Sequence, residues 1–363
     1  MTTHRNTVRY LIATILAVSL LTLTGCSSED TSGTATTINI CVTATDAAEL
    51  VKAVGGNQIS LTTFVRGGDD PHIVNATPAM ITALANADLL VVVGLALEEA
   101  YLPSMLAQAG NDNVMPGQPG HLDLSVNMRT IVGPEGRGVP GSFHPEDNPH
   151  YLADPVEGVK AAKAIAEKLS EIRPDLASEF NANAEAFANS IIVAMVGEHV
   201  AEHTDPANFE ELAIAIETND FTNFPHLQED PSLLAGWLGA LRPYTDIPFV
   251  GDHDLWPYFA RRYGIRAINY LEPEPGVPPT APHLQQVILD MREADARIIL
   301  SIVYFDPQHA AFVANAVDGI AAPMAHQPGG RPGVETYLDF VNYNAQQLLT
   351  AIQTKVGDPP VQQ

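Results

Sequence analysis

The sequence is poor in cysteine and in positive charge. Its 363 residues include only 2 cysteines, so a disulfide framework is excluded and stability must come from hydrophobic cores, which the 46% apolar composition permits. Cys41 lies in the apolar run INICVTA, which predicts a buried core thiol rather than a reactive one. The chain has 18 Lys and Arg residues and 43 Asp and Glu residues, which gives a net charge of -25. This balance argues against nucleic acid and anionic lipid surfaces as partners, and is compatible with cation binding or a saline habitat.

Long apolar runs are also missing, and no stretch is long enough to span a bilayer. Residues 10–23 are apolar but follow Arg5 and Arg9 and are too short for a spanning helix, which is typical of a signal peptide. The run ends in LTGC at Cys26, which resembles the lipobox of bacterial lipoproteins. That resemblance implies cleavage before Cys26 and a lipid anchor on its side chain, which would leave Cys41 without an intramolecular disulfide partner. The alternative is an ordinary secretory signal with a chance cysteine.

Nucleotide-binding glycine motifs are absent too, because neither GxGxxG nor GxxxxGK[ST] occurs. About 340 residues would remain after processing, which predicts two domains. The expected segments are a lipoprotein signal peptide (1–25), a flexible tether (26–37), an N-terminal α/β lobe (38–173), a connecting helix (174–203) and a C-terminal α/β lobe (204–363).

Strand and helix patterns alternate in both expected lobes, and the short links predict parallel sheets, hence an α/β fold. The spacing of Asp46 and Glu49 predicts a capping box, and Thr77-Pro78 predicts another helix start. Residues 111–149 are expected to form a long loop with a short strand around 129–132. Further strands are predicted at 38–43, 59–65, 88–93, 248–251, 266–271, 297–304 and 320–324, with helices at 255–263, 281–294, 307–317 and 335–354.

Three histidines lie far apart in the chain, each in a polar or proline-containing turn that leads into a helix. His72 lies in VRGGDDPHIVNATP, His150 in HPEDNPHYLADP and His253 in FVGDHDLWPYFARRYG. Neutral imidazole is the commonest protein ligand for zinc, so ligands from separate loops predict a metal site formed by tertiary folding. Any one of these residues could equally be a solvated or capping histidine. Because the chain has 12 histidines, the similar settings of these three could also arise by chance.

These motifs resemble the bacterial ABC-transporter solute-binding lipoproteins for zinc and manganese. The matching pieces are DDPHIVNATPAMITALANADLLVVVGLALE, HPEDNPHYLADPVEGVKAAKAIAEKL, GDHDLWPYFARRYGI, LEPEPGVPPTAPHL and TYLDFVNYN, in family order over most of the chain. The resemblance implies two α/β lobes with parallel sheets joined by a long rigid helix, with the metal in the cleft between the lobes. It also implies a permease and an ATPase subunit as partners.

The resemblance assigns His72, His150 and His253 as ligands, and histidine at the third position favours Zn²⁺, with Mn²⁺ as the alternative. The aspartate that relatives use as fourth ligand is missing. The corresponding loop, AAPMAHQPGGRPGVETY, offers only His326, so His326 or water would fill that position. Glu272 and Glu274 are other candidates, although an outer-shell role orienting a histidine fits them better.

The expected function is therefore capture of a divalent transition metal by an extracytoplasmic, lipid-anchored, monomeric protein that performs no chemistry. Because capture requires neutral imidazoles, affinity should fall below about pH 6. One alternative is a zinc-dependent hydrolase with three histidines and an open coordination position, although no HExxH motif supplies a general base. Another is a metal-binding surface adhesin with the same fold.

Overall fold

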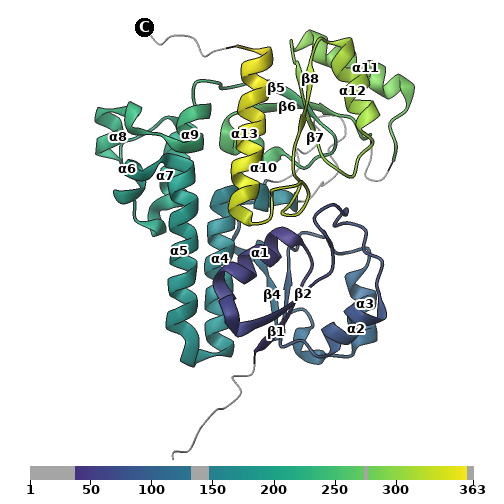
Figure 1. Ribbon diagram of the computed structural model, residues 1–363, viewed down its shortest axis with the longest axis vertical. Helices are drawn as coiled ribbons and strands as arrows, with labels where there is room; N and C mark the ends of the chain where they lie inside the picture. The colour runs from purple at the N-terminus through teal and green to yellow at the C-terminus, as the bar shows by residue number, and fades with distance from the viewer. Residues whose placement is uncertain (1–36, 132–146, 274–276, 358–363) are drawn as a thin grey trace, which may run out of the picture. The chain divides into compact units, whose positions relative to one another are not determined.

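The computed structural model describes residues 37–131, 147–273 and 277–357 (Figure 1). Residues 37–363 form one compact unit, whose described part contains two parallel four-stranded sheets with surrounding helices. The predicted α/β class is therefore confirmed. Cys26 and Glu274 lie outside the described residues. Among the described helices, none combines the length and the apolar character that crossing a bilayer requires.

The first sheet has the strand order β2-β1-β3-β4. Its strands are β1 (Ile38–Val42), β2 (Ile59–Thr63), β3 (Leu89–Val92) and β4 (His121–Asp123). Of the strand expected around 129–132, residues 129–131 form none and residue 132 lies outside the described residues, whereas β4 forms earlier, where Leu122 pairs with Val91. The backbone N–H of Ile131 instead donates to the Tyr258 hydroxyl, outside any strand. The sequence did not predict β4, because only one of its three residues is apolar and so no strand pattern is visible.

The second sheet has the order β6-β5-β7-β8. Its strands agree with the predictions to within a few residues: β5 (Pro248–Gly251), β6 (Arg266–Tyr270), β7 (Ile298–Ser301) and β8 (Ile320–Pro323). The expected strand over 297–304 ends early, because the next backbone N–H, that of Ile302, donates to the Asp252 side chain. The chain thus leaves the sheet at the edge where β5 also ends.

Four helices accompany the first sheet: α1 (Thr45–Gly55), α2 (Pro78–Ala85), α3 (Leu102–Ala109) and α4 (Pro155–Ile172). Thr77 caps α2 as predicted, since its side chain accepts from the Met80 N–H. The capping box at Asp46 and Glu49 was wrong. Ala44 precedes α1 without a side-chain cap, because Glu49 pairs with Lys52 while Asp46 accepts from its neighbour's N–H.

The segment expected to form the connecting helix contains a 3-10 turn (Pro174–Leu176), α5 (Ala177–Val196) and the short α6 (Glu198–Glu202). Gly197 separates α5 from α6 with a φ of 81°, in the region that favours glycine. A Cβ at Gly197 would also lie 2.6 Å from the Ala235 Cβ. Figure 1 shows α5 beside α4, followed by the short helices α7 (Phe209–Thr218), α8 (Pro225–Glu229) and α9 (Gly236–Leu241).

Four helices belong to the second half: α10 (Pro257–Tyr263), α11 (Ala281–Glu293), α12 (Pro307–Ala316) and α13 (Tyr337–Lys355). A capping box begins α13, where the side chains of Thr336 and Asp339 each accept from the other residue's backbone N–H. Because successive strand residues point to opposite faces, each sheet packs on both sides. One face of both sheets joins a shared core with α1, α4, α5 and α13, whereas the other faces pack against α2 and α3 or against α11 and α12.

Candidate metal centre

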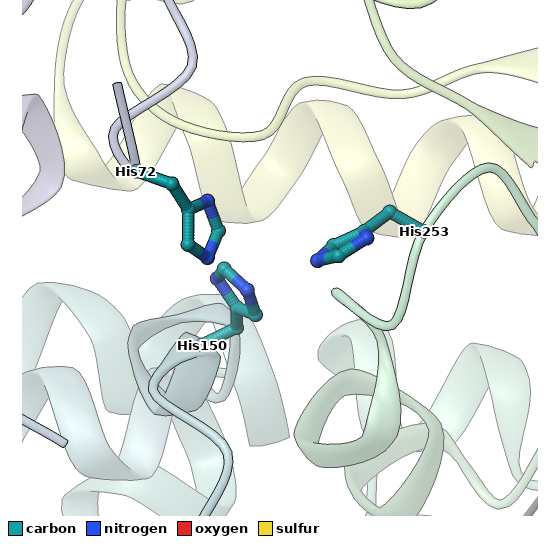
Figure 2. Close-up of side chains that lie close together, drawn as sticks. All are labelled: His72, His150 and His253. Atoms are coloured by element: carbon teal, nitrogen blue, oxygen red, sulfur yellow. The ribbon is translucent and has the colours of Figure 1, made fainter. Parts of the chain in front are cut away.

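Three histidines from separate loops converge near the carboxyl ends of strands, where open α/β sheets bind ligands. His72 follows β2, His253 follows β5, and His150 begins the 3-10 turn His150–Ala153 that precedes α4. One ring nitrogen of each lies within 4.8 Å of the others (Figure 2). The ring centroids are separated by 5.2 Å (His72 to His150), 5.6 Å (His72 to His253) and 5.8 Å (His150 to His253).

Carboxylates orient two of these rings. Nδ1 of His253 lies 2.6 Å from Oε2 of Glu272, and Nδ1 of His72 lies 2.9 Å from Oδ1 of Asp70. When Nδ1–H donates to a carboxylate, Nε2 of the same ring is fixed as the ligand atom, and its basicity rises. Glu272 therefore lies where an outer-shell acceptor was expected. Sequence reasoning missed Asp70, although it lies two residues before His72 in the same motif.

Asn148 holds the backbone of His150 in place. Its Oδ1 accepts from the His150 N–H at 2.9 Å, and its Nδ2 donates to the Asp254 carbonyl at 2.8 Å. The Tyr258 hydroxyl donates to the Asn148 carbonyl at 2.7 Å. One buried amide thus ties the turn of His150 to the loop of His253. The sequence analysis did not identify Asn148, although it opens the NPH motif.

His326 lies beside the three histidines in the loop after β8. Its ring centroid is 5.3 Å from that of His150, and its Nδ1 is 3.5 Å from the Tyr304 hydroxyl. Within the described residues, the group of ligand atoms that lie within 4.8 Å of one another does not include it. Loss of solvation and then the nearby His72 lower the pKa of His326 to about 3, so its ring stays neutral.

The loop of His326 is tied to the loop of His72 by the buried Gln327. Its Nε2 donates to the Asp69 carbonyl at 3.1 Å, and its Oε1 accepts from the Thr45 N–H at 3.2 Å. The two loops touch at Gly67, where a Cβ would lie 2.2 Å from the backbone carbonyl carbon of Gly329. Only glycine permits this approach, so Gly67 and Gln327 position the loop that brings His326 to the site.

A cavity of about 120 Å³ opens beside the histidines. Phe305 stacks against His253 with 6.3 Å between ring centroids. A neighbouring cavity of about 300 Å³ is lined in part by the buried Asp252, whose pKa burial raises to about 7. His72 and His253 therefore line a small cavity together with aromatic and carboxylate side chains. The smaller cavity is lined by Asp70, His72, Ile73, His253, Glu272, Tyr304 and Phe305.

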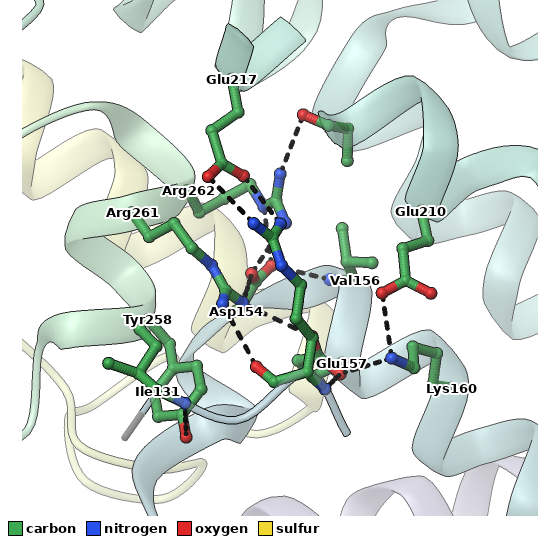
Figure 3. A network of polar contacts seen from close by, with 12 residues as sticks. Ile131, Asp154, Val156, Glu157, Lys160, Glu210, Glu217, Tyr258, Arg261 and Arg262 are labelled. Atoms are coloured by element: carbon green, nitrogen blue, oxygen red, sulfur yellow. Dashed lines mark hydrogen bonds and ion pairs between the residues drawn. The ribbon is translucent and has the colours of Figure 1, made fainter. Parts of the chain in front are cut away.

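A buried ion-pair network fixes the elements behind the site (Figure 3). Asp154 caps α4 by accepting from the Val156 N–H, and both of its oxygens accept from Arg262 of α10 at 2.8 Å. Arg261 donates to the same carboxylate at 3.2 Å. Burial by itself would raise the pKa of Asp154, but the charges of Arg262 and Arg261 hold it below its ordinary value. The turn of His150 is thus locked to the helix that follows His253.

Comparison with known proteins places these features in a family. The model of the family described as zinc-uptake complex component A, periplasmic, matches residues 40–194 and 238–351. These ranges contain β2 to β8, residues 40–42 of β1 and each of the three converging histidines.

Curated relatives match parts of the chain. The manganese-binding lipoprotein MntA of Halalkalibacterium halodurans is 24% identical over 212 residues, 58% of this chain and 65% of that protein. The high-affinity zinc uptake system protein ZnuA of Brucella abortus is 26% identical over 173 residues, 48% of this chain and 39% of that protein. The manganese ABC transporter substrate-binding lipoprotein scaA of Streptococcus gordonii is 24% identical over 188 residues, 50% of this chain and 57% of that protein. The chain thus spans less than two thirds of each relative's length.

A solved structure shares the fold. The crystal structure of a ZnuA deletion mutant with zinc bound superimposes with a TM-score of 0.62 at 20% sequence identity, and covers 87% of this chain and 98% of the other. At 20% identity this similarity shows only that the two proteins share the arrangement of strands and helices.

Proposed function

The chain belongs to the periplasmic zinc-uptake complex component A family, and from this membership we propose that it captures a divalent transition metal outside the cytoplasm. In this proposal it is a binding protein rather than an enzyme, the solute-binding component of an ABC importer. It delivers the ion to a membrane permease driven by an ATPase subunit. The relative scaA, whose name describes an ABC transporter substrate-binding lipoprotein, supports this role.

The observation that carries the proposal is the convergence of His72, His150 and His253. Their ligand atoms lie within 4.8 Å of one another although they come from three loops of the folded unit. Glu272 and Asp70 orient two of the rings through Nδ1, as outer-shell carboxylates do in metal sites. Three converging ring nitrogens beside a small cavity suit an ion better than an organic solute.

Zinc is the ion we propose. Imidazole is a borderline ligand that suits zinc, whereas manganese prefers oxygen-rich sites. The family description and the Brucella relative both name zinc, while two other relatives name manganese. A fourth position completes the tetrahedron that zinc adopts in closed sites, and His326 or a water molecule would occupy it.

The proposed setting is the outer face of a cell membrane. The LTGC sequence at Cys26 supports a lipid anchor, and two relatives are named lipoproteins. The net charge of -25 opposes binding to nucleic acid or to anionic lipid, so the membrane would be contacted through the anchor alone. We propose that the chain acts as a monomer.

Zinc titration of the protein and of three single variants tests the site. His72→Ala, His150→Ala and His253→Ala should each weaken zinc binding by more than the roughly 10–100-fold typical of outer-shell changes, because each removes an inner-shell bond. Zinc should raise the melting temperature of the unaltered protein, since only the folded chain presents all three rings together.

His121→Ala is the matched control, because His121 lies in β4 and its Nδ1 contacts the Val114 carbonyl. This variant should bind zinc as the unaltered protein does. Unchanged titration curves for two of the three site variants would rule out the site. A separate titration with manganese decides the metal, and tighter binding of manganese than of zinc would overturn the choice of ion.

A further inference from the structure

A second histidine cluster lies in the helical segment between α5 and β5. His199 and His203 are four residues apart, on one face of α6 and its end, and their ring centroids lie 4.8 Å apart. His226 of α8 approaches from the other side, with 6.0 Å between its ring centroid and that of His203. These separations bracket the 5.2 to 5.8 Å found among the three histidines of the first site. Within the described residues only the first cluster has its ligand atoms within 4.8 Å of one another, so the rings of the second cluster would have to turn toward a shared ion.

The hydrogen bonds of this cluster leave ring nitrogen atoms available to a metal ion. Nδ1 of His203 lies 2.8 Å from the His199 carbonyl, so Nδ1–H donates to the backbone and Nε2 remains as the ligand atom. Nε2 of His226 is buried and has no hydrogen-bond partner among the described residues. A buried polar atom of this kind costs free energy unless something bonds to it. A metal ion bound between the rings would supply that bond.

We propose that His199, His203 and His226 form a second, peripheral binding site for a divalent transition metal ion such as Zn²⁺. His226 is the fixed ligand, because the neighbouring Phe224 and Leu227 are buried and hold α8 in place. His199 and His203 are exposed, so their rings rotate to complete the coordination. Because two of its three rings are exposed and must become ordered when the ion binds, this site is weaker and more readily exchanged than the first.

The second site is independent of the first. None of its residues lines either cavity beside His72 and His253. Figure 1 shows α6 and α8 next to α7, away from the second sheet. Binding there does not depend on the transport role proposed above.

Zinc stoichiometry measured by equilibrium dialysis separates the two sites. We expect the unaltered protein to bind two zinc ions with different affinities. His199→Ala and His203→Ala should each weaken binding of the looser ion by about tenfold or more, because each removes an inner-shell bond, and should leave the tighter ion unchanged. His150→Ala should do the reverse. His121→Ala serves as the control and should retain both ions.

Circular dichroism shows whether each variant is folded, and the exposure of His199 makes a folding defect at that position unexpected. His226→Gln adds a variant that retains a polar side chain but loses the imidazole, and it too should lose the looser ion. The proposal is overturned if the unaltered protein binds no zinc ion apart from one that His150→Ala removes, if the looser ion survives in folded His199→Ala and His203→Ala, or if His121→Ala loses it equally. Failure of the tighter site alone would count against the proposed function and leave the second site standing.

Discussion

At the scale of single residues, His326 decides whether the proposed zinc centre is closed or keeps a water position. Its ring is near His150, yet it lies outside the closest group of ligand atoms in the described residues. We therefore expect His326→Ala to weaken zinc binding modestly, by less than the roughly 10–100-fold typical of outer-shell changes. Zinc titration beside His150→Ala checks this. A loss as large as that of His150→Ala would instead assign His326 as the fourth ligand.

A second prediction at the residue scale concerns the close backbone contact at Gly67, and the adjacent Gly68 is the control. A Cβ at Gly67 would meet the backbone of Pro328 and Gly329 at 2.2 Å, whereas a Cβ at Gly68 would meet nothing within 4 Å. Gly67→Ala should thus destabilise the fold by about 1–3 kcal/mol through overpacking and loosen zinc binding, since it pushes the His72 and His326 loops apart. Gly68→Ala should stay within about 0.5 kcal/mol. Urea unfolding measures both, and equal effects would refute the close approach.

At the scale of elements, the pair of Asp154 and Arg262 fastens the start of α4 to α10. The pKa of Asp154 is lowered in the folded chain, so the carboxylate adds stability above its unfolded pKa of about 3.9 and loses it as pH falls through the folded pKa. The free energy of unfolding should therefore drop below about pH 4. Asp154→Asn should lower the free energy of unfolding by about 3–5 kcal/mol near neutral pH, because it leaves Arg262 buried without its charge partner. The variant should also show a smaller fall in this free energy below about pH 4.

Urea unfolding followed across pH 2 to 7 measures this slope. Glu171→Gln is the control, because Glu171 belongs to an exposed ion pair with Lys168 on the same helix, and such pairs contribute little. A pH profile that is the same for Asp154→Asn and the unaltered protein would show that another carboxylate accounts for the acid sensitivity.

The elements also show what the sequence could and could not predict. Local signals sufficed for β5 and for α2, where the Thr77-Pro78 pair supplies a cap and a fixed φ. They failed at Asp46, where the capping-box spacing is present but Ala44 is the N-cap. β4 was not predicted, because its position depends on pairing with β3 rather than on any pattern of its own. Tertiary contacts decided both cases.

At the scale of the whole molecule, the site could be assembled from its motifs because each histidine lies in a distinctive turn. The acceptors Asp70 and Asn148 lie inside the same motifs, yet their roles depend on which ring or carbonyl they reach in space. Gln327 carries no such signal, since an isolated glutamine in a loop is ordinarily solvated. Its burial between Thr45 and Asp69 arises from the contact of two loops that are far apart in sequence. The second histidine cluster could likewise not be predicted from the sequence, because only the fold brings His226 close to His203.

The last prediction concerns the attachment of the whole molecule to its membrane through Cys26. The compact unit begins at Thr37, beyond this cysteine, and holds all three site histidines, so attachment and zinc binding should be separable. Cys26→Ser should move the protein from the membrane fraction to the soluble fraction and leave its zinc titration unchanged, because one side chain would bear the lipid. Cys41→Ala is the matched control, since Cys41 is buried and burial raises the pKa of its thiol to about 12, which makes it unreactive. This variant should remain with the membrane. A Cys26→Ser protein that is processed normally and still sediments with the membrane would refute the lipid anchor.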